Sequence, residues 1–170
     1  GTQGRFEQVT FKYFADPNAE NAALLSGDVD IISNVQAPDA LSQFADTSKY
    51  AVTEGTTNGE VVLGLNNDNP ALKDLRVRQA IALAINKQQL VEDAWAGHGT
   101  VIGSMVVPTD PYFEDLSGVN SYDPERAKQL LAEAGYATGL SLRLKPAALP
   151  YATASAQYVA ASLKAVGVDV

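Results

Sequence analysis

The chain has 170 residues, of which 46% are apolar and 19% are charged, and 20 acidic residues against 12 lysines and arginines give a net charge of −8. This length and composition predict a folded protein that buries roughly two-thirds of its unfolded surface. The acidic balance argues against nucleic-acid binding, because a phosphate backbone needs a surface rich in lysine and arginine. The absence of cysteine excludes disulfides, zinc–thiolate sites and thiol nucleophiles. No apolar run reaches the about 18 residues that a membrane-spanning helix needs.

Short strands and helices are predicted to alternate in the first third of the chain. Alternating apolar residues predict a strand over residues 9–14, and acids followed by β-branched residues predict another over residues 28–32. Between them we expect a helix over residues 20–25 that stops at Gly27, which makes a β-helix-β unit. The next expected elements are a short helix over residues 38–44 and strands over residues 50–54 and 61–65.

The longest helical pattern runs from residue 75 to about residue 95, with Asp74 as the expected N-cap. Arg76 and Arg78 place positive charge in its first turn, where the helix dipole favours anions. Some partner should therefore compensate these charges. We expect the two guanidinium groups to bond a carboxylate or backbone carbonyls across a domain crossing, and anion binding is the alternative.

Beyond this helix, the apolar residues of 96–121 follow neither the helical nor the strand period. We therefore expect a long loop that is functional or poorly ordered. A clean helix follows, with Asp123 as N-cap, Pro124 at the first helical position and Gly135 as its stop. The remaining predicted elements are a strand over residues 140–144, a helix over residues 152–166 and a strand that begins at Val168. This order indicates an α/β architecture in two parts. We expect the chain to be a piece of a longer polypeptide.

Few residues could carry catalysis. Asp28 and Asp30 could support acid–base chemistry or bind a hard cation, but acids after a glycine turn are typical of a solvated turn. His98, between two glycines of the long loop, could touch a ligand, yet a lone exposed histidine usually has no such role. Ser104 lacks the flanking pattern of a nucleophile elbow, and there is no glycine-rich phosphate loop. We expect no catalytic residue, metal or cofactor.

Three segments carry a family resemblance. Residues 69–87 hold an Asn-Pro pair, an Asp, the core Arg-Val-Arg-Gln-Ala and an apolar helix that ends in Asn-Lys. Residues 122–136 open with Tyr-Asp-Pro-Glu-Arg-Ala and close with Ala-Gly-Tyr, and residues 23–31 contain Gly-Asp-Val-Asp-Ile. In this order and at this spacing, the three segments resemble bacterial extracellular solute-binding proteins of family 5, the peptide and nickel receptors of ABC importers.

The resemblance implies an α/β fragment of a two-lobed, periplasmic-binding-protein type II-like fold. Residues 1–66 would be the end of the first lobe with the crossing strand, and residues 67–170 the first, truncated part of the second lobe. Such a protein captures peptides or similar small solutes by lobe closure, without breaking a bond. Its partners would be a small-molecule or peptide ligand and ABC permease subunits, but no nucleic acid. It would lie outside the cytoplasm, in the periplasm or held at the cell membrane by a lipid anchor outside this chain.

The resemblance also implies where a ligand could bind. Residues 59–65 are similar to a family strand that borders the cleft, where Val62 and Gly64 replace larger polar or aromatic residues and so disfavour a strongly cationic ligand. Trp95 matches a position whose side chain reaches the ligand in a relative. The alternative is that Trp95 packs in the core as an anchor of the buried helix face. Tyr112 and Phe113 are weaker candidates for ligand contact, and packing within the loop is the alternative for both. The candidate set is Asn58, Gly59, Val62, Gly64, Trp95, Tyr112 and Phe113 for the ligand, and Asn66, Arg76 and Arg78 for a structural or hinge role.

Two other classes of function compete with this interpretation. An α/β-hydrolase-type enzyme is disfavoured, because one histidine and no cysteine cannot supply a nucleophile–base pair or a metal cluster. A sensory or chaperone-like receptor would use the same fold. Genes for a permease and an ATPase beside the gene would distinguish transport from sensing.

Overall fold

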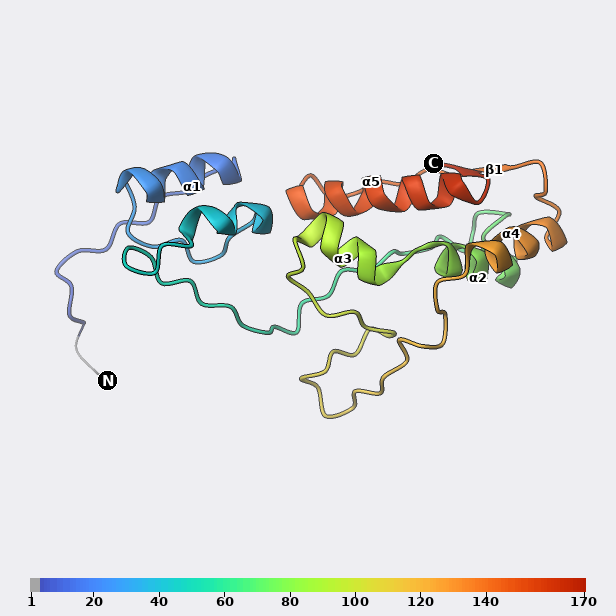
Figure 1. Cartoon of the computed structure of the whole chain (residues 1–170), viewed down its shortest axis with the longest axis horizontal. Helices are drawn as coiled ribbons and strands as arrows, with labels where there is room; N and C mark the ends of the chain where they lie inside the picture. The colour runs from blue at the N-terminus through green and yellow to red at the C-terminus, as the bar shows by residue number, and fades with distance from the viewer. Residues whose placement is uncertain (1–3) are drawn as a thin grey trace. The chain divides into compact units, whose positions relative to one another are not determined.

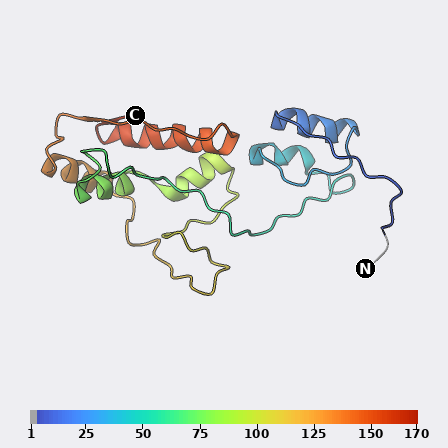
Figure 2. The ribbon, with the colours of Figure 1, turned by 180° about the vertical axis from the view of Figure 1, so that it is seen from behind.

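The structure is a computed structural model that describes residues 4–170. These residues pack into two compact units, one that ends at Tyr50 and one that begins at Ala51. Figures 1 and 2 show the units from opposite sides. Within residues 4–170, no helix has both the length and the apolar character needed to cross a membrane.

Two short helices form the first unit: α1, Pro17–Ser26, and the 3-10 helix η1, Pro38–Phe44. Each begins with proline, whose fixed φ and missing N–H suit the first helical turn. The carboxylate of Asp16 caps α1 by accepting hydrogen bonds from two backbone N–H groups of the first turn. Gly27 ends α1 in the left-handed conformation, with φ of 78°. Both predicted helices and the glycine stop are confirmed, although α1 begins earlier than expected.

A small apolar core holds the first unit. Phe44 is only 3% exposed and meets Tyr50 edge to face, with 5.2 Å between the ring centroids. This geometry places the positive edge of one ring against the negative face of the other. The other buried apolar residues of this unit are Ala23, Ala37 and Ala40.

The strands predicted over residues 9–14, 28–32, 50–54 and 61–65 are wrong. A strand needs a neighbouring segment that satisfies its N–H and C=O groups. Each of these four segments lacks such a neighbour within the described part of the chain, so the expected β-helix-β unit does not form there. Their apolar side chains are consequently exposed, as Phe11 and Tyr13 show at 78% and 93%.

The second unit is built mainly from helices. They are α2, Leu75–Ala84; α3, Lys87–Trp95; α4, Pro124–Glu133; and α5, Pro150–Ala165. Helix α2 packs along α4, and α5 lies against both α2 and α3 (Figures 1 and 2). The core gathers around Val77 and Ala80, which are fully buried. Its other buried members include Ile81, Ala84, Ala127, Leu130, Leu131, Val159, Leu163, Val166 and Val168.

Two short parallel strands complete the second unit. Strand β1, Leu140–Ser141, pairs with β2, Val168–Asp169, and α5 connects them as a crossover. Both strands are confirmed, but β1 has two residues where the sequence predicts a strand over residues 140–144. A further hydrogen bond, from the Leu142 N–H to the Asp169 carbonyl over 2.8 Å, continues the ladder for one step. Beyond it, residues 143 and 144 have no neighbour to pair with in the described chain.

The single helix predicted over residues 75–95 is wrong, because the chain breaks it into α2 and α3. Ile85 is extended, with φ of −104° and ψ of 112°, and ends α2. Asn86 then caps α3 by accepting a hydrogen bond from the Gln89 N–H over 3.1 Å. A capping residue followed three positions later by glutamine is a recognised helix start. The sequence therefore contained this signal, but the continuous apolar stripe masks it.

Helix α4 confirms its predicted start. The Asp123 carboxylate accepts a hydrogen bond from the Arg126 N–H over 2.9 Å, and Pro124 is the first helical residue. The Asp123 N–H donates to the carbonyl of Leu83 over 2.9 Å, which fixes the beginning of α4 to the last turn of α2. Gly135, with φ of 93°, follows the helix as expected.

The long loop over residues 96–121 is confirmed, since neither helix nor strand interrupts it. It begins at Ala96, which ends α3 in the left-handed conformation with φ of 50°. Gly103 packs directly on the opposite side of the loop: a Cβ atom there would lie 2.0 Å from the carbonyl carbon of Leu116. The loop is therefore folded on itself at a point where only glycine fits.

Candidate ligand-binding site

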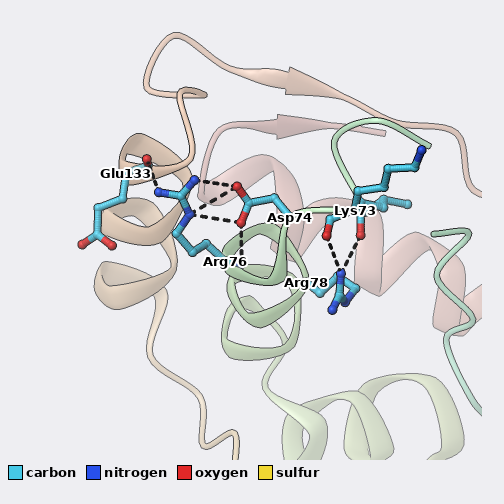
Figure 3. A network of polar contacts seen from close by, with 6 residues as sticks. Lys73, Asp74, Arg76, Arg78 and Glu133 are labelled. Carbon is cyan, nitrogen blue, oxygen red and sulfur yellow. Dashed lines mark hydrogen bonds and ion pairs between the residues drawn. The ribbon is translucent and has the colours of Figure 1, made fainter. Parts of the chain in front are cut away.

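The arginines of α2 are engaged within the second unit (Figure 3). The Arg76 guanidinium pairs with the Asp74 carboxylate at 2.6 Å and also donates to the carbonyl of Glu133 in α4 over 2.6 Å. Arg78 donates to the carbonyls of residues 72 and 73, each over 2.9 Å. Both guanidinium groups bond a carboxylate or carbonyls, as expected, but all these partners follow residue 66, so the contacts do not span the expected domain crossing. These contacts join the turn before α2 to α2 itself and to α4.

Charge couples Asp74 to this network. The hydrogen bonds from the side chain and then the backbone N–H of Arg76 lower the pKa of Asp74 to about 2. In return, the Asp74 side chain raises the pKa of Arg76. The carboxylate is the N-cap of α2 and the guanidinium spans α2 and α4, so the pair stabilises the helix start while it remains ionised.

Two polar contacts join the segment over residues 51–60 to the long loop. The Thr109 hydroxyl donates to the side-chain oxygen of Asn58 over 2.7 Å. Nearer the start of the loop, His98 Nδ1 lies 2.9 Å from a carboxylate oxygen of Glu54. Sequence reasoning selected Asn58, considered His98 without selecting it, and missed Thr109 and Glu54, because no local pattern indicates contacts between such distant positions.

The residues beside Asn58 add hydrogen-bonding groups to this place. The Gly59 N–H donates to the hydroxyl of Thr57 over 3.1 Å, which forms a tight turn. Glu60 Oε2 is shielded from solvent and accepts no hydrogen bond within residues 4–170. A buried acceptor left unsatisfied costs about 1 to 3 kcal/mol, so a donor from water, a ligand or another part of the protein is expected. Sequence reasoning missed Glu60, although it is the one charged residue entering the apolar run over residues 61–65.

Trp95, at the end of α3, is bound to α5. Its ring lies 5.1 Å from that of Tyr151, with the planes at 45°, and its indole N–H donates to the Ser155 hydroxyl over 3.1 Å. Ser155 is buried, while Trp95 is half-buried. The indole donor is thus occupied inside the protein.

Tyr112 and Phe113 lie in a turn of the long loop. The Asp110 carboxylate accepts a hydrogen bond from the Tyr112 N–H over 2.8 Å, and the Asp110 carbonyl accepts one from the Phe113 N–H over 3.1 Å. Tyr112 is 86% exposed, whereas Phe113 is half-buried. The turn presents the tyrosine ring to solvent.

A pocket of about 430 Å³ lies between residues 63–66 and the chain after β1, a volume in the range of small-ligand sites. Of the candidate residues, Gly64 and Asn66 line it, whereas the exposed Val62 does not. The side-chain oxygen of Asn66 accepts a hydrogen bond from the Asp68 N–H over 3.0 Å, which fixes the turn before α2. The other lining residues are Leu63, Leu65, Asn69, Leu72, Ile81, Leu142, Arg143, Leu144, Val159, Leu163 and Val170.

The candidate residues therefore fall into separate groups: one at the contact of Asn58 with the long loop, one at the pocket and one around Trp95. In the described chain, no three histidine, aspartate or glutamate side chains gather closely enough to hold a metal ion. The candidate acid Asp28 pairs with Lys12 at 2.6 Å on the surface of the first unit.

Comparison with known proteins extends these observations. The profile of bacterial extracellular solute-binding proteins, family 5 Middle, matches residues 1–170. A putative ABC transporter peptide-binding protein of Brucella ovis is 34% identical over 136 residues, which cover 80% of this chain and 25% of that protein. The dipeptide-binding protein of Escherichia coli is 29% identical over 175 aligned residues, which cover 99% of this chain and 32% of that protein. The chain spans about a quarter to a third of the length of these curated relatives.

The fold also matches solved structures. NikA from Brucella suis, in complex with Fe(III)-EDTA, superposes with a TM-score of 0.81 at 26% identity. The match covers 100% of this chain and 37% of that one. The expected fold class, part of a two-lobed periplasmic-binding-protein type II-like fold, is thereby confirmed.

Proposed function

Because the chain belongs to the bacterial extracellular solute-binding proteins of family 5, we propose that it is part of the substrate-binding component of an ABC importer. This component captures a peptide or a similar small solute by closing two lobes around it. The observation that carries the proposal is the family match over the whole chain, supported by the superposition on NikA.

A peptide is the ligand class that the relatives favour. One curated relative is named as a peptide-binding protein and another as a dipeptide-binding protein. A peptide offers both N–H donors and carbonyl or carboxylate acceptors, which suits the amide of Asn58 and the unsatisfied carboxylate oxygen of Glu60. Glu60 also supplies an acidic group to this segment, in which Val62 and Gly64 carry no charge.

We assign the ligand to the side chains and backbone around Asn58, Gly59, Val62 and Gly64, and we keep Tyr112 and Phe113 of the long loop as further candidate contacts. Trp95 is assigned as an anchor between α3 and α5, because its indole donor is bonded to Ser155. The ligand would bind by reversible contacts alone, without catalysis.

The lobe assignment follows the same proposal. Residues 1–66 end the first lobe and cross to the second, which begins with residues 67–170. The proposed crossing at residue 66 lies inside the second compact unit, whereas the two compact units divide after Tyr50. Asn66 shapes the turn after the crossing, and Arg76 and Arg78 brace the first helix that follows it.

The remaining assignments concern the setting of the protein. The family is one of extracellular solute-binding proteins, and we propose that this member works in the periplasm or from a lipid anchor at the outer face of the cell membrane. Its partners would be the ABC permease subunits that receive the solute from the closed form.

Thermal unfolding of the native-length polypeptide with a panel of solutes tests the proposal. The panel contains the dipeptide Met-Leu, longer peptides and Fe(III)-EDTA, with N-acetylated, C-amidated Met-Leu as a matched control. A ligand present at 100 times its Kd adds about 2.7 kcal/mol to the free energy of unfolding, which is a measurable rise in Tm. The proposal fails if none of the solutes raises Tm and the protein instead hydrolyses an ester, phosphate or peptide reporter.

A further inference from the structure

Asn58 and Thr109 are joined by a hydrogen bond in which the Asn58 side-chain oxygen is the acceptor. An amide oxygen can only accept, so the Thr109 hydroxyl gives its hydrogen to Asn58 Oδ1 over 2.7 Å. The oxygen and nitrogen lie on opposite sides of the planar amide group. Asn58 Nδ2 therefore keeps two N–H donors, as no second hydrogen bond to Asn58 forms within residues 4–170.

The orientation depends on the long loop. Asn58 is exposed and lies outside any helix or strand, so its own backbone does little to hold the side chain. Thr109 comes from the loop, which is folded tightly on itself at Gly103. The contact of Glu54 with His98 joins the same two segments a second time, at 2.9 Å. The loop thus holds Thr109 in place against the segment that carries Asn58.

We propose that Thr109 is a positioning residue that makes Asn58 a hydrogen-bond donor to the solute. This part of the site then takes an acceptor oxygen, in the form of a carboxylate or a peptide carbonyl. The inference rests on the proposed function, because it requires a solute to bind at Asn58. A carboxylate forms the stronger hydrogen bond with an amide N–H, since one partner carries a full charge.

The first experiment needs no solute. In the native-length protein, ¹⁵N relaxation of the Asn58 side-chain amide reports how far its orientation is restricted. We expect the order parameter to fall in Thr109→Val, which keeps the shape of the side chain but removes the hydroxyl, and to be restored in Thr109→Ser. An unchanged order parameter in Thr109→Val overturns the positioning role whether or not any solute binds.

The second experiment is a double-mutant cycle with Met-Leu as the probe. Thr109→Val should raise Kd by about three- to tenfold, as the loss of one oriented hydrogen bond does, while Thr109→Ser stays near wild type. In an Asn58→Ala background, Thr109→Val should have no further effect. An equal loss in both backgrounds overturns the proposal, because Thr109 would then act independently of Asn58.

Two further arms identify the acceptor. Asn58→Asp replaces the donor with acceptor oxygens, so it should weaken Met-Leu more than Asn58→Ala does; tighter binding by Asn58→Asp overturns the proposal. The C-terminal amide of Met-Leu keeps the carbonyl and removes the charged carboxylate. If the Asn58→Ala effect survives with this amide, the acceptor is a carbonyl, and if it disappears, the acceptor is the carboxylate. Failure of the wild type to bind Met-Leu would count against the proposed ligand class, and the relaxation result would still decide the role of Thr109.

Discussion

At the scale of single residues, the side chains around the start of α2 show how a local electrostatic conflict is resolved. Two arginines occupy the turn where the helix dipole disfavours them. Arg76 is neutralised by the N-cap Asp74, and Arg78 donates to backbone carbonyls. The conflict visible in the sequence correctly indicated that the two arginines have partners. Which groups these are could be learned only from the fold, because one of them, the carbonyl of Glu133, is far away along the chain.

Asp74 gives this network a defined pH dependence. Its pKa falls from the ordinary value of 3.8 to about 2 in the folded protein. A carboxyl group with a lowered pKa stabilises the folded state above its unfolded pKa, and this stabilisation is lost as the pH falls through the folded pKa. We therefore expect Asp74→Asn to lower Tm at pH 7, and the difference from wild type to shrink between about pH 4 and pH 2.

Thermal unfolding of both proteins from pH 2 to pH 7, followed by circular dichroism, measures this difference. The exposed Asp30 serves as the matched control, since Asp30→Asn should leave Tm nearly unchanged at every pH. A Tm difference for Asp74→Asn that stays constant down to pH 2 would contradict the linkage.

Arg78 permits a second test at the residue scale. Arg78→Gln leaves the carbonyls of residues 72 and 73 without their donor, which should cost about 1 kcal/mol of the free energy of unfolding. Urea titration measures the loss. Arg143→Gln is the control, because Arg143 is exposed and makes no ion pair within residues 4–170. If Arg78→Gln unfolds like wild type, the arginine has no structural role and anion binding becomes its better explanation.

At the scale of elements, the sequence was most informative where the physics is local. The caps of α1 and α4 follow from Asp16, Gly27 and Asp123, each acting within a few residues. The predicted strands failed because pairing depends on a distant neighbour, which no local pattern can reveal. Asn86 is the intermediate case, as its cap is local but the apolar stripe continues through it.

The candidate site was predictable only in part, for the same reason. The segment around Asn58 was found through a family resemblance, and the structure adds contacts from residues far along the chain. Thr109 and Glu54 carry no signature of their own, because an exposed threonine and an exposed glutamate are common on any surface. Only their position opposite Asn58 and His98 makes them candidates.

The long loop provides the test at the element scale. Gly103→Ala would place a methyl group 2.0 Å from the backbone of Leu116, so the loop must open there. We expect a lower Tm and faster proteolytic cleavage within residues 96–121. Gly118→Ala is the matched control, because nothing lies within 4 Å of a Cβ atom at that position. Equal cleavage rates for the two variants would show that the close approach at Gly103 does not hold the loop.

At the scale of the whole molecule, the chain accounts for about a quarter to a third of the length of its curated relatives. Under the proposed function, a cleft between two lobes needs contacts from both, and this chain supplies only some of them. We therefore expect residues 1–170 alone to bind Met-Leu at least about 100-fold more weakly than the native-length polypeptide, as follows from the loss of more than about 2.7 kcal/mol of contacts.

Isothermal titration calorimetry of both polypeptides measures the ratio, and circular dichroism verifies that the shorter one keeps its helices. A Kd of residues 1–170 for Met-Leu within about tenfold of that of the native-length polypeptide would contradict the shared cleft and would place the complete binding site within this chain.

The hydrogen bond from the Asp123 N–H to the Leu83 carbonyl has an evolutionary consequence. It returns the polypeptide to the end of α2 after the excursion over residues 96–121 that follows α3. Insertions and deletions inside that excursion can accumulate while the helical scaffold stays intact. Under the proposed function, natural variation there retunes solute preference, and laboratory diversification of the same stretch offers a route to new specificities.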